Sequence, residues 1–122
     1  MKIYRQYVKF GLLGLGRVVK SRVSSVFKNE INYSKVVAVY DKNKHKNEKF
    51  TKFFKVPKTN SLRELLRKEL DFIYLSTESG NHAKHIKKCF DANKNVIVEK
   101  PPTLRVDQLI KLEDIAKNKR LL

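Results

Sequence analysis

The chain has 122 residues, of which 41% are apolar and 33% are charged, and its formal net charge is +16. This length predicts a single domain covering residues 1–122, and the composition is typical of a globular chain. No apolar run approaches the roughly 18 residues of a membrane span, and the start of the chain lacks the apolar core of a secretory signal. We therefore expect a cytoplasmic protein without a membrane partner.

The excess of Lys and Arg raises the hypothesis of a nucleic-acid partner, because clustered cations neutralise phosphates. The basic residues are spread along the whole chain, however, and no motif combines aromatic and basic residues for base stacking. We therefore expect no nucleic-acid partner, whereas an anionic substrate such as a sugar nucleotide stays compatible with the charge. The single cysteine, Cys89, is expected to be a buried thiol in a reducing compartment.

Short apolar runs alternate with amphipathic stretches along the chain. In chain order, we predict a strand at 8–13, a helix at 17–27, a strand at 35–40, a helix at 44–54, a short edge strand at 58–60, a helix after Ser61, a strand at 72–76, a helix at 79–92, a strand at 95–98 and a helix after Thr103. This alternation predicts the α/β class, with a doubly wound parallel sheet and a ligand at the carboxyl ends of the strands.

Two of these helices carry a candidate N-cap. Ser61 and Glu64 have the spacing of a capping box, in which the hydroxyl accepts from the Glu64 N–H and the carboxylate reaches back. Thr103 is placed to cap the last helix. His45 and His85 are expected to be exposed to solvent, and the Cys, His and Asp residues lack metal-ligand spacing, so we expect no metal.

The turn after the first predicted strand contains Gly14 and Gly16. A strand before such glycines and a helix after them is the context of the dinucleotide fingerprint G-x-G-x-x-G, whose backbone N–H groups hold a pyrophosphate. The third glycine would stand at position 19, where this chain has Val19. That glycine serves packing of the helix on the strand, so its loss leaves two interpretations open: a nucleotide site or a structural turn.

Asp41 ends the second predicted strand, 25 residues after Gly16. A carboxylate at this place accepts hydrogen bonds from the adenosine ribose and repels a 2′-phosphate, which favours NAD over NADP. Lys42 follows directly and partly offsets that repulsion. The alternative is an aspartate that caps the next helix.

Several further segments resemble the N-terminal domain of the Gfo/Idh/MocA oxidoreductases, the glucose-fructose oxidoreductase and inositol dehydrogenase family. The matching pieces are "GLLGLGRVV", "VVAVYDKN", "LRELL", "DFIYLSTESGNHAKHI" and "NVIVEKPPTL", in the family's order and over nearly the entire chain. The Glu-Lys-Pro step after a strand is the most specific of them. The resemblance implies a Rossmann-like domain that binds NAD, or NADP.

The resemblance also implies roles for individual residues. Lys100 would be the catalytic lysine, which reaches nicotinamide and substrate and assists proton movement during hydride transfer. The implied cofactor-binding residues are Gly14, Leu15, Gly16, Arg17, Val18, Asp41, Ser76, Thr77, Glu78, His82, Glu99 and Lys100. The chain departs from the family at Glu78, where a proline is usual, and at Arg22, where a histidine is frequent.

Family members carry a second α/β domain that binds substrate and commonly supplies the oligomer contacts. The resemblance therefore implies a domain truncated before the C-terminal substrate domain and without those contacts. Joined to such a domain, it would transfer hydride between nicotinamide and a carbinol of a sugar, cyclitol or sugar nucleotide. The alternatives are a non-catalytic remnant or regulatory dinucleotide-binding module, and a basic nucleic-acid-binding protein.

Overall fold

The computed structural model describes residues 7–16, 19 and 34–122. The helix expected at 17–27 lies outside the described residues, apart from Val19. None of the described helices is long and apolar enough to cross a membrane.

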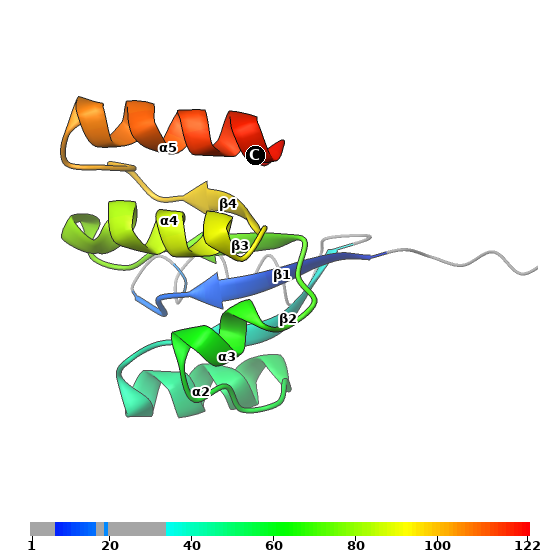
Figure 1. The fold of residues 1–122 in the computed structure, drawn as a ribbon. Helices are drawn as coiled ribbons and strands as arrows, with labels where there is room; N and C mark the ends of the chain where they lie inside the picture. Colours follow the sequence, from blue (N-terminus) through cyan, green and yellow to red (C-terminus); the bar gives the residue numbers. More distant parts are fainter. Residues whose placement is uncertain (1–6, 17–18, 20–33) are drawn as a thin grey trace, which may run out of the picture.

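Four strands form one parallel sheet in the order β2-β1-β3-β4 (Figure 1). The strands are β1 (Val8–Leu13), β2 (Ser34–Tyr40), β3 (Phe72–Leu75) and β4 (Asn95–Val98). Because β1 has β2 on one side and β3 on the other, the chain crosses from one half of the sheet to the other at β1. This arrangement confirms the doubly wound parallel sheet, and a crevice is expected outside the carboxyl ends of β1 and β3.

Within the described residues, four α-helices and one short 3-10 helix connect and cover these strands. They are α2 (Lys44–Phe54), α3 (Leu62–Leu66), η2 (Ser79–Asn81), α4 (His82–Asp91) and α5 (Val106–Lys119). In Figure 1, α5 lies beyond β4 at one edge of the sheet and α2 lies beyond β2 at the other.

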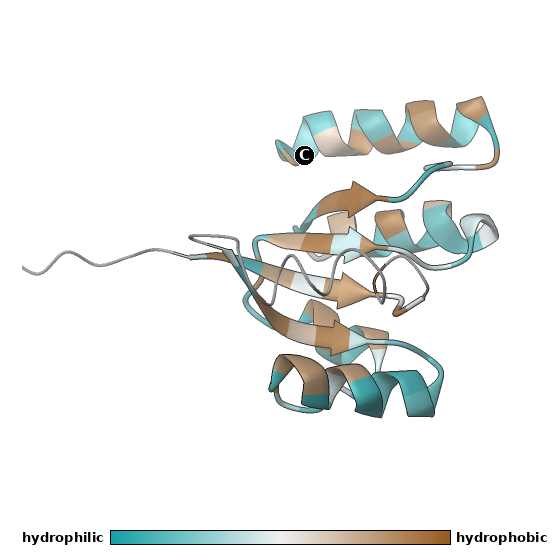
Figure 2. Ribbon diagram, turned by 180° about the vertical axis from the view of Figure 1, so that it is seen from behind, coloured by the Kyte–Doolittle hydropathy of each residue, from teal (hydrophilic) through white to brown (hydrophobic). Residues whose placement is uncertain are grey.

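The sheet has an apolar core on each of its faces, because successive side chains of a strand point to opposite sides. Leu13 belongs to the larger core, which contains residues of α3, α4 and α5. Leu12 belongs to the smaller core, together with Phe50 of α2 and Val19, whose side chain is fully buried. Figure 2 shows the strands as the most hydrophobic part of the molecule, between helices with mixed faces. Position 19, where the fingerprint has its third glycine, thus contributes a buried side chain to this core.

The short strand expected at 58–60 was wrong. Residues 56–60 have no regular secondary structure, and β2 is the edge of the sheet. The Thr59 carbonyl accepts a hydrogen bond of 2.8 Å from the Asn47 side chain of α2, which takes the place of a ladder bond. A buried side-chain donor thus holds this segment where the sequence suggested a strand.

The capping prediction was right for α3 and wrong for α5. The Ser61 hydroxyl accepts from the Glu64 N–H at 3.0 Å, and the Glu64 carboxylate accepts from the Asn60 N–H, one residue before the expected partner. At α5 the N-cap is Arg105, and the Thr103 hydroxyl donates to the Arg105 carbonyl at 2.8 Å. Thr103 therefore shapes the turn that precedes the helix instead of capping it.

Candidate functional site

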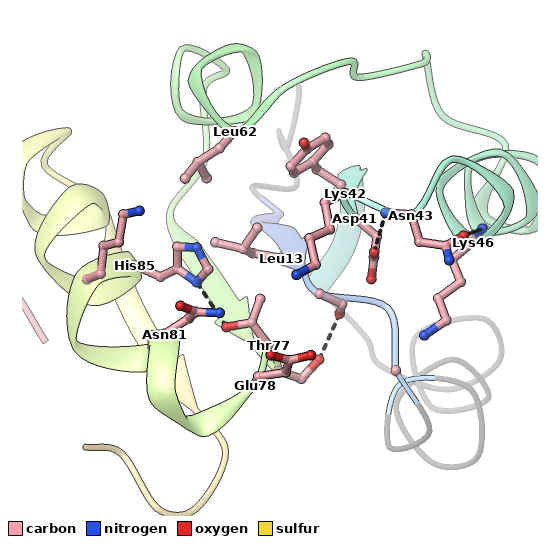
Figure 3. A pocket seen from close by; sticks show the side chains of 15 residues that line it. Leu13, Asp41, Lys42, Asn43, Lys46, Leu62, Thr77, Glu78, Asn81 and His85 are labelled. Carbon is pink, nitrogen blue, oxygen red and sulfur yellow. Dashed lines mark hydrogen bonds between the residues drawn. The ribbon is translucent and has the colours of Figure 1, made fainter. Parts of the chain in front are cut away.

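A cleft of about 640 Å³ opens at the carboxyl ends of β1, β2 and β3 (Figure 3). Its wall continues over Leu62 of α3 and over the first turns of α2 and α4. The lining residues are Leu13, Gly14, Gly16, Tyr40, Asp41, Lys42, Asn43, Lys46, Leu62, Ser76, Thr77, Glu78, Asn81, Lys84 and His85. The cleft thus lies where a doubly wound sheet binds its ligand.

The glycine turn forms the floor of this cleft and is fixed from both sides. The Gly14 N–H donates to the Tyr40 carbonyl of β2 at 2.9 Å, and the Ser76 hydroxyl donates to the Gly14 carbonyl at 2.7 Å. Gly14 has a φ of +88°, and a Cβ at this position would lie 2.7 Å from the Thr77 nitrogen. No side chain fits there.

Gly16 differs from Gly14, since among the described residues a Cβ built on it would approach only the Ser76 oxygen, at 3.9 Å. The part of the chain that the structure describes therefore leaves room for a side chain at position 16. Because Gly16 lines the cleft, its missing side chain leaves the backbone open to a ligand.

Asp41 joins the glycine turn to the start of α2. Its Oδ2 accepts from the Leu15 N–H and its Oδ1 accepts from the Asn43 N–H, both at 2.8 Å. Asp41 lines the cleft, as the ribose interpretation requires, whereas the alternative of a helix cap was wrong: the N-cap of α2 is Asn43, and Asp41 orders the turn before it. It uses one lone pair of each oxygen on the backbone.

The buried side chain of Asn47 fixes the backbone at Asp41 through a hydrogen bond. The residue is 5% exposed, and its Oδ1 accepts from the Asp41 N–H at 3.0 Å while its Nδ2 donates to the Thr59 carbonyl. Sequence reasoning missed Asn47, because a polar residue in a charged helix gives no sign that it faces inward.

The opposite wall begins with Ser76, Thr77 and Glu78, which follow β3. His85 lies across from them on α4 and was expected to be exposed, which was wrong: it is half-buried and lines the cleft. Its Nδ1 lies 2.9 Å from the Thr77 hydroxyl oxygen. Burial lowers the pKa of His85, and neighbouring cations, foremost Lys88, lower it further.

His82 is 1% exposed and lies behind this wall, outside the lining of the cleft. Its Nδ1 is 2.7 Å from the Pro101 carbonyl and its Nε2 is 2.7 Å from the Thr77 carbonyl. A neutral imidazole donates to one of these oxygens and an imidazolium to both. His82 thereby links the loop after β3 to the loop after β4, and its contact with any cofactor would be indirect.

Glu99 and Lys100 follow β4, also outside the lining of the cleft. The Tyr74 hydroxyl of β3 donates to the Glu99 carboxylate, while Lys100 is exposed and its peptide bond to Pro101 is cis. Burial, and secondly the hydrogen bond to Glu99, raise the pKa of Tyr74 to about 12. Tyr74 therefore remains a neutral donor that fixes Glu99 beside Lys100.

The structure brings six of the residues expected to bind a cofactor into the cleft, namely Gly14, Gly16, Asp41, Ser76, Thr77 and Glu78. Leu15 is buried beneath them, and its N–H is bonded to Asp41. Arg17, Val18 and the departure at Arg22 lie outside the described residues. In the part of the chain that the structure describes, no three His, Cys, Asp or Glu residues are grouped so that they could hold a metal ion.

Comparison with known proteins gives the same picture. Residues 8–122 match the family model described as "Oxidoreductase family, NAD-binding Rossmann fold". The chain is 30% identical over 119 residues to a dTDP-3,4-didehydro-2,6-dideoxy-alpha-D-glucose 3-reductase of Saccharopolyspora spinosa. This alignment covers 97% of the chain and 36% of that protein, so the chain spans about a third of the relative's length.

Solved structures share the fold. KijD10, a 3-ketoreductase of Actinomadura kijaniata in complex with TDP-benzene and NADP, superimposes with a TM-score of 0.89 at 24% identity, over 96% of this chain and 37% of that one. The dehydrogenase MviM of Clostridium difficile gives a TM-score of 0.84 at 26% identity, over 93% of this chain and 37% of that one. The match of the family model over residues 8–122 shows that the chain belongs to the Gfo/Idh/MocA oxidoreductase family, of which it represents the NAD-binding Rossmann domain.

Proposed function

We propose that the cleft holds the adenosine and pyrophosphate of a nicotinamide dinucleotide, and that this domain serves an oxidoreductase acting on a carbinol of a sugar nucleotide. The observation that carries the binding proposal is Gly16, where residues 7–16, 19 and 34–122 leave room for a side chain that the sequence omits. A close approach of a pyrophosphate to the backbone explains that omission. The buried lone thiol of Cys89 agrees with a reducing compartment such as the cytoplasm.

The residues of the cleft suit the successive parts of such a cofactor. The glycine turn presents backbone at the edge of β1, and Asp41 stands at the end of β2, where a ribose hydroxyl would meet its free lone pairs. Leu62 offers an apolar surface and His85 a ring on the opposite side, which suits a flat adenine. Expected donors to the pyrophosphate also include Arg17 and Val18, which the structure does not describe.

When bound, the nicotinamide ring would supply the acceptor or donor of the hydride. Lys100, which is exposed, would polarise the substrate oxygen with its ammonium group or move its proton. Glu99 would orient Lys100 or contact the cofactor, and Tyr74 keeps Glu99 in place. His82 would act on the cofactor through the Thr77 carbonyl that it holds.

The proposed substrate class rests on the relatives alone. The 30%-identical relative bears the name of a dTDP-sugar reductase, and the dehydrogenase WlbA of Chromobacterium violaceum was solved with NADH and UDP-GlcNAcA. A sugar nucleotide is an anion, which agrees with the net charge of +16. Because the chain spans about a third of these proteins, the substrate and the turnover are proposals for a protein that contains this domain.

The glycine turn provides the test. We expect Gly16→Ala to leave the fold intact, because its Cβ would be in ordinary contact with a single oxygen of the described residues. We expect it to weaken binding of both NADH and NADPH by about tenfold or more. The measurement is a fluorescence titration of the chain with each cofactor, with circular dichroism to verify the fold. Gly80→Ala is the matched control, since its Cβ would also meet a single atom at 3.9 Å and it lies outside the cleft.

Two results would contradict the proposal. One is a folded wild-type chain that binds neither cofactor at millimolar concentrations. The other is a Gly16→Ala variant that binds both cofactors as tightly as the Gly80→Ala variant does.

A further inference from the structure

The cleft has a basic end beside Asp41, and we propose that it makes the domain prefer NADP(H) to NAD(H), with Lys42 and Lys46 as the specificity-determining residues. The inference rests on the proposed function, because it assigns the place of the 2′-phosphate within the same cleft. It runs against the preference for NAD that Asp41 suggests when only the sequence is considered.

The first argument concerns Asp41, whose carboxylate has a structural task. Each of its oxygens accepts a backbone N–H at 2.8 Å, one from Leu15 and one from Asn43. Hydrogen bonds to an ionised group are stronger than those between neutral groups, and they offset part of its charge. The presence of Asp41 is thus explained without a ribose, and its repulsion of a neighbouring phosphate is reduced.

The second argument concerns the cations around Asp41. Lys42 and Lys46 are exposed and line the cleft, and Figure 3 shows them on either side of the Asp41 side chain. Neither lysine takes part in any salt bridge among the described residues. Their ammonium groups are therefore available to an anion from outside.

The third argument concerns the N-terminus of α2, which begins at Lys44, shortly after Asp41 and Lys42. Its N-cap is Asn43, and its first turn contains no acidic residue. The positive end of the helix dipole therefore adds to the two lysines. The cleft contains a third lysine, Lys84 of α4, so that three lysines face two carboxylates, those of Asp41 and Glu78.

The chemistry of the two cofactors differs at this place. NADP carries a phosphate on the 2′-oxygen of the adenosine ribose, with a charge of about −1.5 to −2 at neutral pH. NAD has a neutral hydroxyl there, which can accept a hydrogen bond but offers the two ammonium groups no opposite charge. Lysine is a common ligand of phosphate, as a mobile point charge with three donors.

The experiment compares pairs of ligands that differ only in the 2′-phosphate. The wild-type chain is titrated with NADPH and NADH, and then with adenosine 2′,5′-bisphosphate and adenosine 5′-monophosphate. We expect each phosphorylated ligand to bind about tenfold more tightly or better, and its affinity to fall more steeply with added salt. The variant Lys42→Ala/Lys46→Ala should lose this difference, because its affinity for NADPH should fall far more than its affinity for NADH.

Lys52→Ala is the matched control, because Lys52 is an exposed lysine of the same helix outside the cleft, and it should keep the preference. Lys46→Glu should reverse the preference, which keeps the test decisive even if one lysine compensates for the other. Equal affinities for NADPH and NADH, or tighter binding of NADH, would overturn the inference and leave the proposed function standing. Binding of neither cofactor to a folded chain would instead overturn the proposed function.

Discussion

At the scale of single residues, His85 couples the cleft to pH. Its pKa is lowered from the ordinary value of 6.5, first by burial and then by Lys88 and Lys84. Below about pH 6.5 the unfolded chain therefore binds more protons at this position than the folded chain does. The stability that neutral His85 contributes is complete above that pH and is lost as the pH falls towards the lower pKa of the folded state.

We expect His85→Gln to flatten this part of the pH dependence. The measurement is the free energy of urea unfolding between about pH 5 and 8 for the wild type and the variant. His45→Gln, at an exposed site of α2, is the control and should follow the wild-type curve. An unchanged slope in His85→Gln would show that the ring is solvated in the folded protein.

His85 also shows what the hydrophobic pattern of a sequence cannot predict. Gly14 and Asp41 could be predicted because a strand end places them at the crevice whatever the rest of the fold does. His85 lies off the apolar stripe of its helix, which in a sequence indicates solvent. It is half-buried at the cleft, where the loop after β3 brings the Thr77 hydroxyl within 2.9 Å of its ring and where Leu62, distant in sequence, also lines the wall.

At the scale of elements, the start of α3 depends on one side chain. The helix has five residues, too few to be stable through its own hydrogen bonds, and Ser61 satisfies one of its free N–H groups. We expect Ser61→Ala to lower the free energy of unfolding by about 1 kcal/mol, measured by urea denaturation. Ser79→Ala is the control, because its hydroxyl caps no N–H in the part of the chain that the structure describes. A loss equal to that of Ser79→Ala would refute the role of the cap.

The elements also show where sequence patterns are sufficient. The boundaries of β1 and α2 agree with the prediction, because an apolar run before glycines and a polar stretch with three Phe residues leave few alternatives. The segment at 58–60 and the start of α5 were wrong. Each of these segments is held by a side-chain hydrogen bond that the pattern does not reveal. The Asn47 side chain donates to the Thr59 carbonyl in the first, and the Thr103 hydroxyl donates to the Arg105 carbonyl before α5.

At the scale of the whole molecule, the family and the order of the elements could be predicted from the sequence. The roles of the many lysines and arginines in the fold could not. The chain contains 28 Lys and Arg against 12 Asp and Glu. Some lysines serve the fold: the Lys119 ammonium donates to the Phe90 carbonyl at the end of α4, and that of Lys94 donates to the Lys68 carbonyl. Such cations stabilise carbonyl groups near helix ends, where intrahelical partners are missing. Their partners come from distant segments, so composition alone cannot identify them.

The remaining excess of positive charge should make the stability depend on salt. The four ion pairs found among the described residues all lie at the surface, where each is worth little. A net charge of +16 repels itself in the compact state. Raising NaCl from about 0.01 M to about 0.15 M shortens the Debye length from about 30 Å to about 8 Å and screens this repulsion more than it weakens the few pairs.

We therefore expect the melting temperature of the chain, without cofactor, to rise over this range of NaCl. A gain of about 1 kcal/mol would correspond to a rise of about 4 °C in a domain of this size. Acetylation of the lysines at low salt should reproduce part of the gain, because it removes charge without adding ions. A melting temperature that is constant or falls with NaCl would mean that attractive pairs outweigh the net charge. In that case the lysines would be arranged as local partners of carbonyls and carboxylates, and the basic end of the cleft would be one further example of such placement.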